Sequence, residues 1–412
     1  MPPAPSRPTE RSPPSLALAL AMGTLLAGVA GGVAFPILPI VGLRLGLSLP
    51  FIGVILAANR AMRVVSSPFI GVLADRFGGR RTLLVGLALQ IVVMGLYALG
   101  IVTQRPGLFF LAGRLLHGPG SACVFVSAQA LALHSGGASH GGRAAGTVRA
   151  AIVLGVPVGL LVGGLLSEAV GDAATFAIAG GAVVVSLAVA WARVPDLRAP
   201  VGTRAPFGET LRAMRDRRLL AVGTLNFALN FAVGGMVLTT LALLVHGRHV
   251  SVLGRNEQGT AGLLMGWMTI LDAATTPLAG RLGDRWHAHA RVATLGVALL
   301  VPGLLLLGLS DHLGGIAAGL ALLGVGAAGL GPSLLVLMGA LVPRERRGTG
   351  AGMLQLCGDV GGMAGPLVGT VLFAGSTVVP YVGTAVLLAG FVPVAAWLAR
   401  VETRAREGSV AK

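Results

Sequence analysis

Charge is the scarcest property of this sequence. Of its 412 residues, 11% are charged and 54% are hydrophobic, whereas a soluble domain has about 25% charged residues. A water-soluble fold cannot bury so much apolar surface, so we expect most of the chain to lie in lipid. The two cysteines, Cys123 and Cys357, lie inside apolar runs. They indicate small packing residues rather than a disulfide or a metal site.

Catalytic and ligand-binding motifs are also lacking. The sequence contains no glycine-rich phosphate loop after a strand and no Ser/His/Asp grouping, and its eight histidines show no metal-ligand spacing. We therefore expect neither an enzyme nor an ATP-driven pump, and neither a cofactor nor a metal ion.

Long apolar runs take the place of these motifs. A bilayer core requires about 20 apolar residues per helix. Residues 1–14 are polar and Pro-rich, which predicts a disordered tail. The runs that follow predict twelve helices near 16–40, 49–72, 82–103, 107–133, 146–168, 173–192, 219–245, 259–280, 292–310, 313–342, 350–374 and 378–399.

The arginines define the expected topology. With both termini inside, 24 of the 31 Lys and Arg residues fall in inner segments and four fall in outer loops. This bias predicts cytoplasmic termini and assigns the net charge of +16 to contact with anionic lipid rather than nucleic acid. The most basic inner segment, 193–218, separates the first six helices from the last six.

Two motifs repeat at nearly one offset. GVLADRFGGRR at 71–81 has a weaker copy, GRLGDRWHAHAR, at 280–291. GVPVGLLVGG at 155–164 has a copy, GGMAGPLVGT, at 361–370. The offsets of 209 and 206 residues indicate a duplicated six-helix unit.

These features together resemble the major facilitator superfamily. Between helices two and three, the family pattern is matched by Gly71, Asp75, Arg76, Gly78, Arg80 and Arg81; in helix four it is matched by Arg114, Gly118 and Gly120. The drug–proton antiporter branch has a glycine motif in helix five, which Gly155, Gly159, Gly163 and Gly164 fit. Leu160 stands where that motif has proline, and the copy with Gly361, Gly365, Pro366 and Gly369 in helix eleven matches better.

The resemblance implies an all-α polytopic membrane protein, with twelve transmembrane helices in two pseudo-symmetric six-helix bundles around a central cavity. The expected parts are a cytoplasmic tail (1–14), the N-terminal bundle (15–192), a basic cytoplasmic linker (193–218), the C-terminal bundle (219–400) and a second cytoplasmic tail (401–412).

The charged loop between helices two and three is expected to act as a gate. Asp75 at the inner end of helix two can pair with arginines and cap a neighbouring helix. The cluster would latch the two halves together on the inside, and its members are Asp75, Arg76, Arg80 and Arg81 with their counterparts Asp284 and Arg285. A plain positive-inside anchor explains the arginines but not the two carboxylates.

Charges inside the membrane need partners because each costs at least about 2.5–3.5 kcal/mol at a helix centre. In the family, helix two faces helix eleven and helix five faces helix eight. Arg63 and Asp359 lie at matching depth, which predicts one bridge, and Arg149–Asp272 is a second. The alternative is that each carboxylate bonds within its own half. Either Asp272 or Asp359 could carry a proton, unless the pairs are static.

Six further polar residues are candidates for substrate contact, namely Asn59, Arg60, Arg114, His117, Asn226 and Asn230. Arg60, Arg114 and His117 would make one side of the cavity cationic. The asparagines could instead join helices.

The sequence therefore predicts a secondary transporter in the bacterial inner membrane that works by alternating access. Proton-coupled export of small apolar or amphipathic compounds is the leading expectation. An organic-anion transporter is the alternative, and a receptor or scaffold on the same fold is a third. The expected partners are a small-molecule substrate, protons and membrane lipid, and a monomer is the default state.

Overall fold

The computed structural model describes residues 14–135, 137–196, 216–342 and 347–410, and within these ranges it is helical with short connections. The first six helices are α1 (Pro14–Arg44), α2 (Leu49–Phe77), α3 (Gly79–Val102), α4 (Pro106–Ser135), α5 (Gly137–Val170) and α6 (Asp172–Arg193). The remaining elements are α8 (Arg217–Leu229), η1 (Asn230–Val237), α9 (Leu238–Gly247), α10 (Glu257–Trp286), α11 (His289–Leu309), α12 (Leu313–Leu341), α13 (Arg347–Gly375) and α14 (Val379–Val410).

Twelve spans are present in these described ranges. Eleven stretches are long and apolar enough to cross a bilayer, and one of them joins α8, η1 and α9 into a single 31-residue span. The π-helical η1 lies in the middle of that span. The twelfth span is α10, which has 30 residues but carries Asp272, Arg281, Asp284 and Arg285 and is therefore less apolar.

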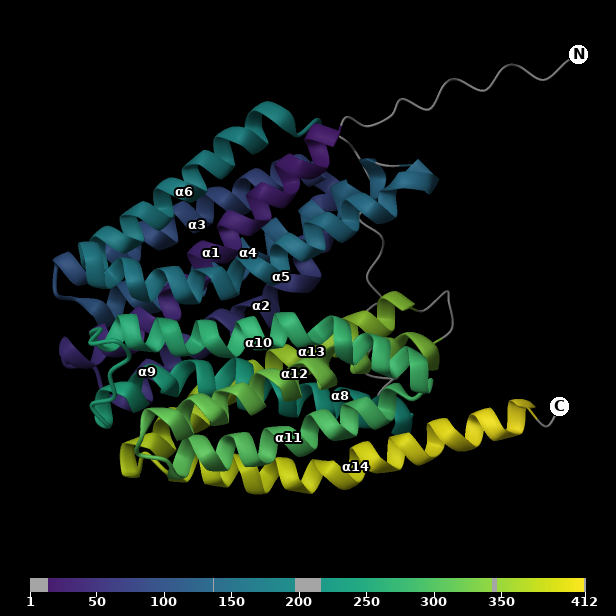
Figure 1. The fold of residues 1–412 in the computed structure, drawn as a ribbon. Helices are drawn as coiled ribbons and strands as arrows, with labels where there is room; N and C mark the ends of the chain where they lie inside the picture. Colours follow the sequence, from purple (N-terminus) through teal and green to yellow (C-terminus); the bar gives the residue numbers. More distant parts are fainter. Residues whose placement is uncertain (1–13, 136, 197–215, 343–346, 411–412) are drawn as a thin grey trace, which may run out of the picture.

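The spans form two bundles, which confirms the predicted fold class. In Figure 1 helices α1–α6, coloured purple to teal, lie together, and helices α8–α14, coloured teal to yellow, lie beside them. One apolar core is made by α1–α6, and a second is made almost entirely by α8–α14. Burial of one apolar face by each helix thus occurs mainly within its own bundle.

The connection between α2 and α3 is tighter than the sequence predicts. A loop of several residues was expected, but α2 continues to Phe77 and α3 begins at Gly79, so the turn is Gly78 alone. Gly78 has φ +91°, a conformation that glycine adopts without strain. The charged motif therefore lies on the last turn of one helix and the first turn of the next.

Two helix pairs make the most extensive contacts between the bundles, namely α2 with α13 and α5 with α10, and α1 adds smaller contacts with α9 and α10. We call the end of the bundle that carries Arg44 and Glu257 the outer end, and the end that carries Gly78 and His287 the inner end. Near the outer end Gly164 approaches Gly262 closely enough that a Cβ on Gly262 would lie 2.9 Å from the Gly164 Cα. Gly53 packs against the Pro366 carbonyl in the same way, with 2.7 Å for its Cβ position. Glycine thus lets the backbones of the two bundles touch in the outer half.

Candidate functional site at the middle of the membrane

Asp359 on α13 lies at the centre of a charged cluster between the bundles. The side chain is buried, and its Oδ1 accepts a hydrogen bond of 2.9 Å from Arg60 Nη1. Arg63 Nε donates to Asp359 Oδ2 over 3.1 Å, and Arg63 Nη2 also bonds to Oδ1. Gln355, one turn earlier on α13, donates to Oδ2 over 2.9 Å. The carboxylate therefore receives four hydrogen bonds, three of them from the other bundle.

The contact between Arg63 and Asp359 is the one that the matching depths predict. Its role in coupling or gating stays a prediction. Arg60 is a second partner of Asp359 that the sequence did not indicate; it was predicted only as a substrate contact. Because Arg60 and Arg63 are separated by three residues, both guanidinium groups reach the same face of α2. The cluster of two arginines and one aspartate has a net charge of +1.

Glycines on α13 make room for this cluster. A Cβ on Gly362 would lie 3.2 Å from the guanidinium carbon of Arg60, and a Cβ on Gly358 would lie 2.9 Å from Asn226 Nδ2. Larger residues at these two positions would push the arginine or the asparagine away from α13. Glycine in helix eleven therefore gives Arg60 and Asn226 the space to pack against α13.

Asp272 on α10 has a different environment from Asp359. It is partly buried, and within the described residues its recorded hydrogen bond comes from Thr276 Oγ1 at 3.4 Å. The predicted bridge from Arg149 is not formed, since Arg149 is exposed. The antiparallel helices place Leu161 opposite Gly266, so Asp272 is level with Gly155. Arg149 therefore lies about 9 Å nearer the inner end, beyond reach.

Arg114 and His117 on α4 are buried cationic or polar groups without an acidic partner in the described part of the chain. Arg114 is 1% exposed and His117 is 4% exposed. The Arg114 guanidinium lies 5.1 Å from the centre of the Phe35 ring and 5.9 Å from that of Tyr97. Its Nε and Nη2, together with His117 Nδ1 and Asn59 Oδ1, have no hydrogen-bond partner among the described atoms. Three of the predicted substrate contacts thus retain unused polar atoms.

Asn226 joins two helices, which is the alternative that the sequence left open, whereas Asn230 bonds to Asn226 within its own span. Asn226 Nδ2 donates to the Leu354 carbonyl over 2.7 Å, which ties α8 to α13. Asn230 Nδ2 donates to the Asn226 carbonyl over 3.0 Å. Both amide groups are used in hydrogen bonds within the protein. Their role in substrate binding stays a prediction.

The glycine motifs pack helices mainly within each bundle, and Gly164 is an exception that packs against the other bundle. On α5, Gly155, Gly159 and Gly163 lie against Gly28, Gly32 and Val33 of α1, and Gly164 faces α10. On α13, Gly361, Gly365 and Gly369 lie against Phe227, Phe231 and Met236 of the seventh span, and Pro366 contacts Gly235. The two copies therefore occupy related places in the two bundles. Leu160, which replaces the expected proline, is fully buried.

The inner charged motif makes its described contacts within single bundles. Arg80 Nη2 donates to the Trp191 carbonyl over 2.6 Å, and its guanidinium lies 5.5 Å from the centre of the Trp191 ring. Arg76 lies over Phe77, and Arg81 is exposed. In the copy, Asp284 Oδ1 lies 3.2 Å from His289 Nε2, and Arg285 is exposed.

The side chain of Asp75 lies outside the described part of the chain. Among the ion pairs between described residues, none joins the inner ends of the two bundles. The expectation that these arginines latch the two halves is therefore not met by the described contacts of Arg76, Arg80 and Arg81, because Arg80 is held by α6 of its own bundle. The latch stays a prediction for Asp75.

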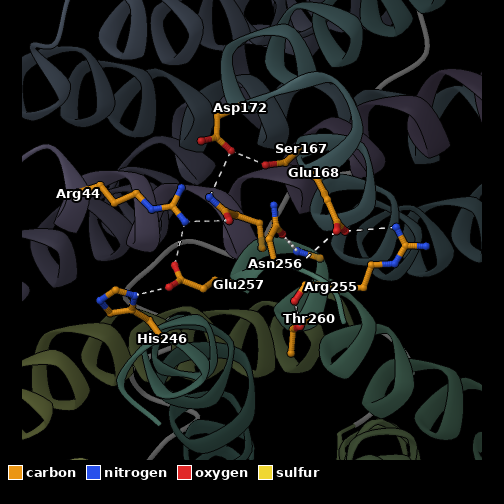
Figure 2. A network of polar contacts seen from close by, with 11 residues as sticks. Arg44, Ser167, Glu168, Asp172, His246, Arg255, Asn256, Glu257 and Thr260 are labelled. Atoms are coloured by element: carbon orange, nitrogen blue, oxygen red, sulfur yellow. Dashed lines mark hydrogen bonds and ion pairs between the residues drawn. The ribbon is translucent and has the colours of Figure 1, made fainter. Parts of the chain in front are cut away.

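The outer end carries a polar network that the sequence analysis missed (Figure 2). Arg44 at the end of α1 donates to Glu257 at the start of α10 over 2.9 Å, and His246 Nδ1 lies 2.8 Å from the same carboxylate. Beside it, Arg255 pairs with Glu168 of α5 at 3.4 Å. Ion pairs at helix ends and in loops thus link the two bundles at the outer surface.

The electrostatics of this network favour the ionised carboxylate. Partial burial alone would raise the pKa of Glu257, but hydrogen bonds from His246 and Arg44 and their positive charge outweigh it, so the pKa of Glu257 is lowered. Gln258 extends the network, since it accepts from Arg44 over 3.3 Å and donates to Asp172 over 3.5 Å. Within the described ranges no group of three or more His, Cys, Asp or Glu side chains could hold a metal ion.

A twelve-span protein with charged groups held between two bundles has the architecture of a secondary transporter. The Major Facilitator Superfamily model matches residues 20–257 and again residues 256–412. The chain belongs to this superfamily, and each half matches the model by itself.

Curated relatives include multidrug efflux proteins. The multi-drug resistance efflux pump PmrA of Streptococcus pneumoniae is 25% identical over 360 residues, covering 84% of this chain and 86% of its own length. Multidrug resistance protein MdtG of Escherichia coli is 25% identical over 366 residues, with 86% of each chain covered.

Solved structures share the fold at low identity. The nucleoside transporter NupG, in the structure of a point mutant, has a TM-score of 0.75 at 12% identity and covers 94% of this chain and 99% of its own. The human organic anion transporter MFSD10 (TETRAN) has a TM-score of 0.67 at 21% identity and covers 93% and 100%. The fold and the transporter class predicted from the sequence are confirmed.

Proposed function

We propose that this transporter exports small apolar or amphipathic compounds in exchange for protons. The observation that carries the proposal is the contrast between two embedded carboxylates of the C-terminal bundle. Asp359 is neutralised by Arg60 and Arg63 of the other bundle, and Asp272 has a hydroxyl donor and no described cation beside it. The relatives PmrA, a multi-drug resistance efflux pump, and MdtG, a multidrug resistance protein, support export of drugs.

The coupling follows from the exchange of partners at the midplane. In the outer-closed arrangement, Asp359 is ionised and holds α2 against α13. Asp272 has no described cation beside it, so it is the carboxylate that we assign to carrying the exchanged proton. Opening of the outer end separates α2 from α13. Both carboxylates then face the outer side of the membrane. Because the two carboxylates change their surroundings between the outer-closed and the outer-open state, proton exchange in one state is linked to substrate binding in the other.

The remaining roles are assigned on the same basis. Arg114, His117 and Asn59 offer unused polar atoms for a substrate, and the Asp75 cluster with Asp284 and Arg285 latches the inner end when the outer end opens. We further propose that both termini lie in the cytoplasm and that the protein is a monomer in a bacterial inner membrane. The excess of Lys and Arg in the inner segments supports the orientation.

Transport in proteoliposomes with an imposed pH gradient tests the proposal. The substrate panel contains a neutral amphipathic dye, a lipophilic cation and an organic anion. We expect gradient-driven movement of the first two and proton flux when they are added. Asp272→Asn should abolish gradient-driven transport, and Asp311→Asn, which changes an exposed carboxylate of an outer loop, should leave it unchanged. Transport that ignores the pH gradient would refute proton coupling.

An organic anion is the second candidate substrate, because Arg114 is buried without an acidic partner in the described residues and the Asp359 cluster has an excess positive charge. The same panel separates the two candidates. Movement of the organic anion alone, lost in Arg114→Gln and Arg60→Gln, would favour this second function.

A further inference from the structure

Three arginines meet at the inner end between α11 and α14, on the side of the C-terminal bundle away from α2 and α5. Arg291, Arg400 and Arg404 line a groove of about 330 Å³ together with Ala399 and Thr403. All three arginine side chains are exposed. None of the three belongs to the charged cluster around Asp359. Arg291 is the last residue of the motif copy at 280–291, and Arg400 and Arg404 lie outside both copies.

The groove is held in shape by contacts between the two helices. Arg291 Nη2 donates to Thr403 Oγ1 over 3.4 Å, and Thr403 in turn donates to the Ala399 carbonyl over 2.9 Å. The backbone N–H of Ala290 donates to Glu402 over 2.9 Å, so that carboxylate is drawn toward the start of α11. These contacts fix the start of α11 against the end of α14, where the three arginines line the groove.

The depth of the groove matches the headgroup region of a bilayer. Arg400 lies 21 residues after the first residue of α14, Val379, which places it about 32 Å along the helix. A bilayer core is about 30 Å thick. Arg291 is the third residue of α11, which begins at the inner end. The guanidinium groups thus reach the phosphate level of the leaflet at the inner end.

Apolar side chains continue the groove toward the membrane centre. Leu295, one turn after Arg291, is 50% exposed, and Trp397, three residues before Arg400, is 39% exposed. Residues three or four apart lie on one helix face, so each apolar side chain lies directly below an arginine. Tryptophan at this depth is typical of the membrane interface. A cationic pocket above an exposed apolar surface fits a phosphate that carries acyl chains better than a free anion.

We propose that this groove binds the phosphate headgroup of an anionic phospholipid in the leaflet at the inner end. Basic pockets between transmembrane helices bind such headgroups through charge-assisted hydrogen bonds to the phosphate. The bound lipid would join α11 to α14 and cover the gap between their inner ends. The proposal depends on the membrane fold and is independent of which compound the protein transports.

Native mass spectrometry of the full-length protein, delipidated in neutral detergent and titrated with phosphatidylglycerol, tests the site. The groove variant is Arg291→Gln/Arg400→Gln/Arg404→Gln. Its matched control, Arg193→Gln/Arg217→Gln/Arg218→Gln, removes three exposed inner arginines outside the groove and changes the net charge equally. We expect the tightest phosphatidylglycerol site to be unchanged in the control and on the order of 100-fold weaker in the groove variant.

Two further arms separate the possible ligands. Phosphatidylcholine should bind equally to all three proteins, and inorganic phosphate at the same concentration should not displace phosphatidylglycerol. Equal phosphatidylglycerol binding by the groove variant and the control would overturn the proposal. Displacement by inorganic phosphate, lost in the groove variant, would also overturn it and indicate a free-anion site. If the groove variant does not fold, the double change Arg400→Gln/Arg404→Gln is compared with Arg400→Lys/Arg404→Lys, which should retain the lipid.

Discussion

Replacing Asp359 by asparagine should open the outer end. The substitution keeps the size of the side chain but leaves Arg60 and Arg63 without their counter-charge. Breaking a buried ion pair by removing one partner costs about 3–5 kcal/mol. The two arginine side chains are 24% and 19% exposed, so water screens part of the loss and we expect about 3 kcal/mol. The substitution therefore destabilises the outer-closed state, in which α2 contacts α13, relative to the outer-open state.

A shift of this size changes the ratio of outer-open to outer-closed protein on the order of 100-fold. The labelling rate of Thr370→Cys reports it, because Thr370 is fully buried against Gly53 of α2 near the outer end. The background carries Cys123→Ala and Cys357→Ala, and the reagent is a membrane-impermeant maleimide. We expect labelling on the order of 100-fold faster in Asp359→Asn.

The matched control is the double variant Arg63→Gln/Asp359→Asn. It leaves Arg60 as the one charge of the cluster and so keeps the net charge of +1 found in the unchanged protein. We expect most of the closure to return in this variant, since one unpaired buried guanidinium is removed. Labelling of Asp359→Asn at the unchanged rate would refute the claim that the cluster holds the outer-closed state.

Three other predictions concern separate parts of the molecule. Gly164→Leu should prevent the close approach of α5 to Gly262, which abolishes transport and opens the outer end in the labelling assay; unchanged transport would contradict this packing. Glu257 has a lowered pKa in the closed state, so its stabilising effect is present above its usual pKa of about 4.5 and is lost as pH falls through the lowered value. Spin labels at Gln104→Cys and Asp311→Cys should therefore separate at acidic pH, and Glu257→Gln should remove that pH dependence. Arg114→Met should raise the midpoint of thermal unfolding by a few degrees, since a buried group with unpaired N–H donors costs about 1–3 kcal/mol. The same variant should lose transport. A lower unfolding midpoint would contradict the claim that the Arg114 donors are unpaired.

The parts of the fold that depend on apolar length and charge bias could be predicted from the sequence. The spans are set by how many apolar residues cross a bilayer, so most of their centres agree with the structure even where the ends extend by several residues. The pair Arg63–Asp359 could be predicted because both residues are charged and embedded and because counting along each helix gives matching depths. The family resemblance supplied the remaining information, that helix two faces helix eleven.

Other contacts depend on information that depth does not contain. Counting gives the level of Arg149 and Asp272 only roughly, and the packing of Leu161 against Gly266 shifts them apart. Arg60 was missed as a partner because one carboxylate was assigned one arginine. The outer network joins Arg44 to Glu257 across 213 residues, and both lie at helix ends, where the hydrophobic pattern gives no signal about orientation.

Alternating access is the central claim, and paired distance measurements test it most directly. Double electron–electron resonance on Gln104→Cys/Asp311→Cys reports the outer end, and the same measurement on Arg193→Cys/His287→Cys reports the inner end, both with and without Asp359→Asn. The account predicts that the outer distance increases while the inner distance decreases in the Asp359→Asn protein. Distances that stay fixed at both ends, or that increase together, would contradict it.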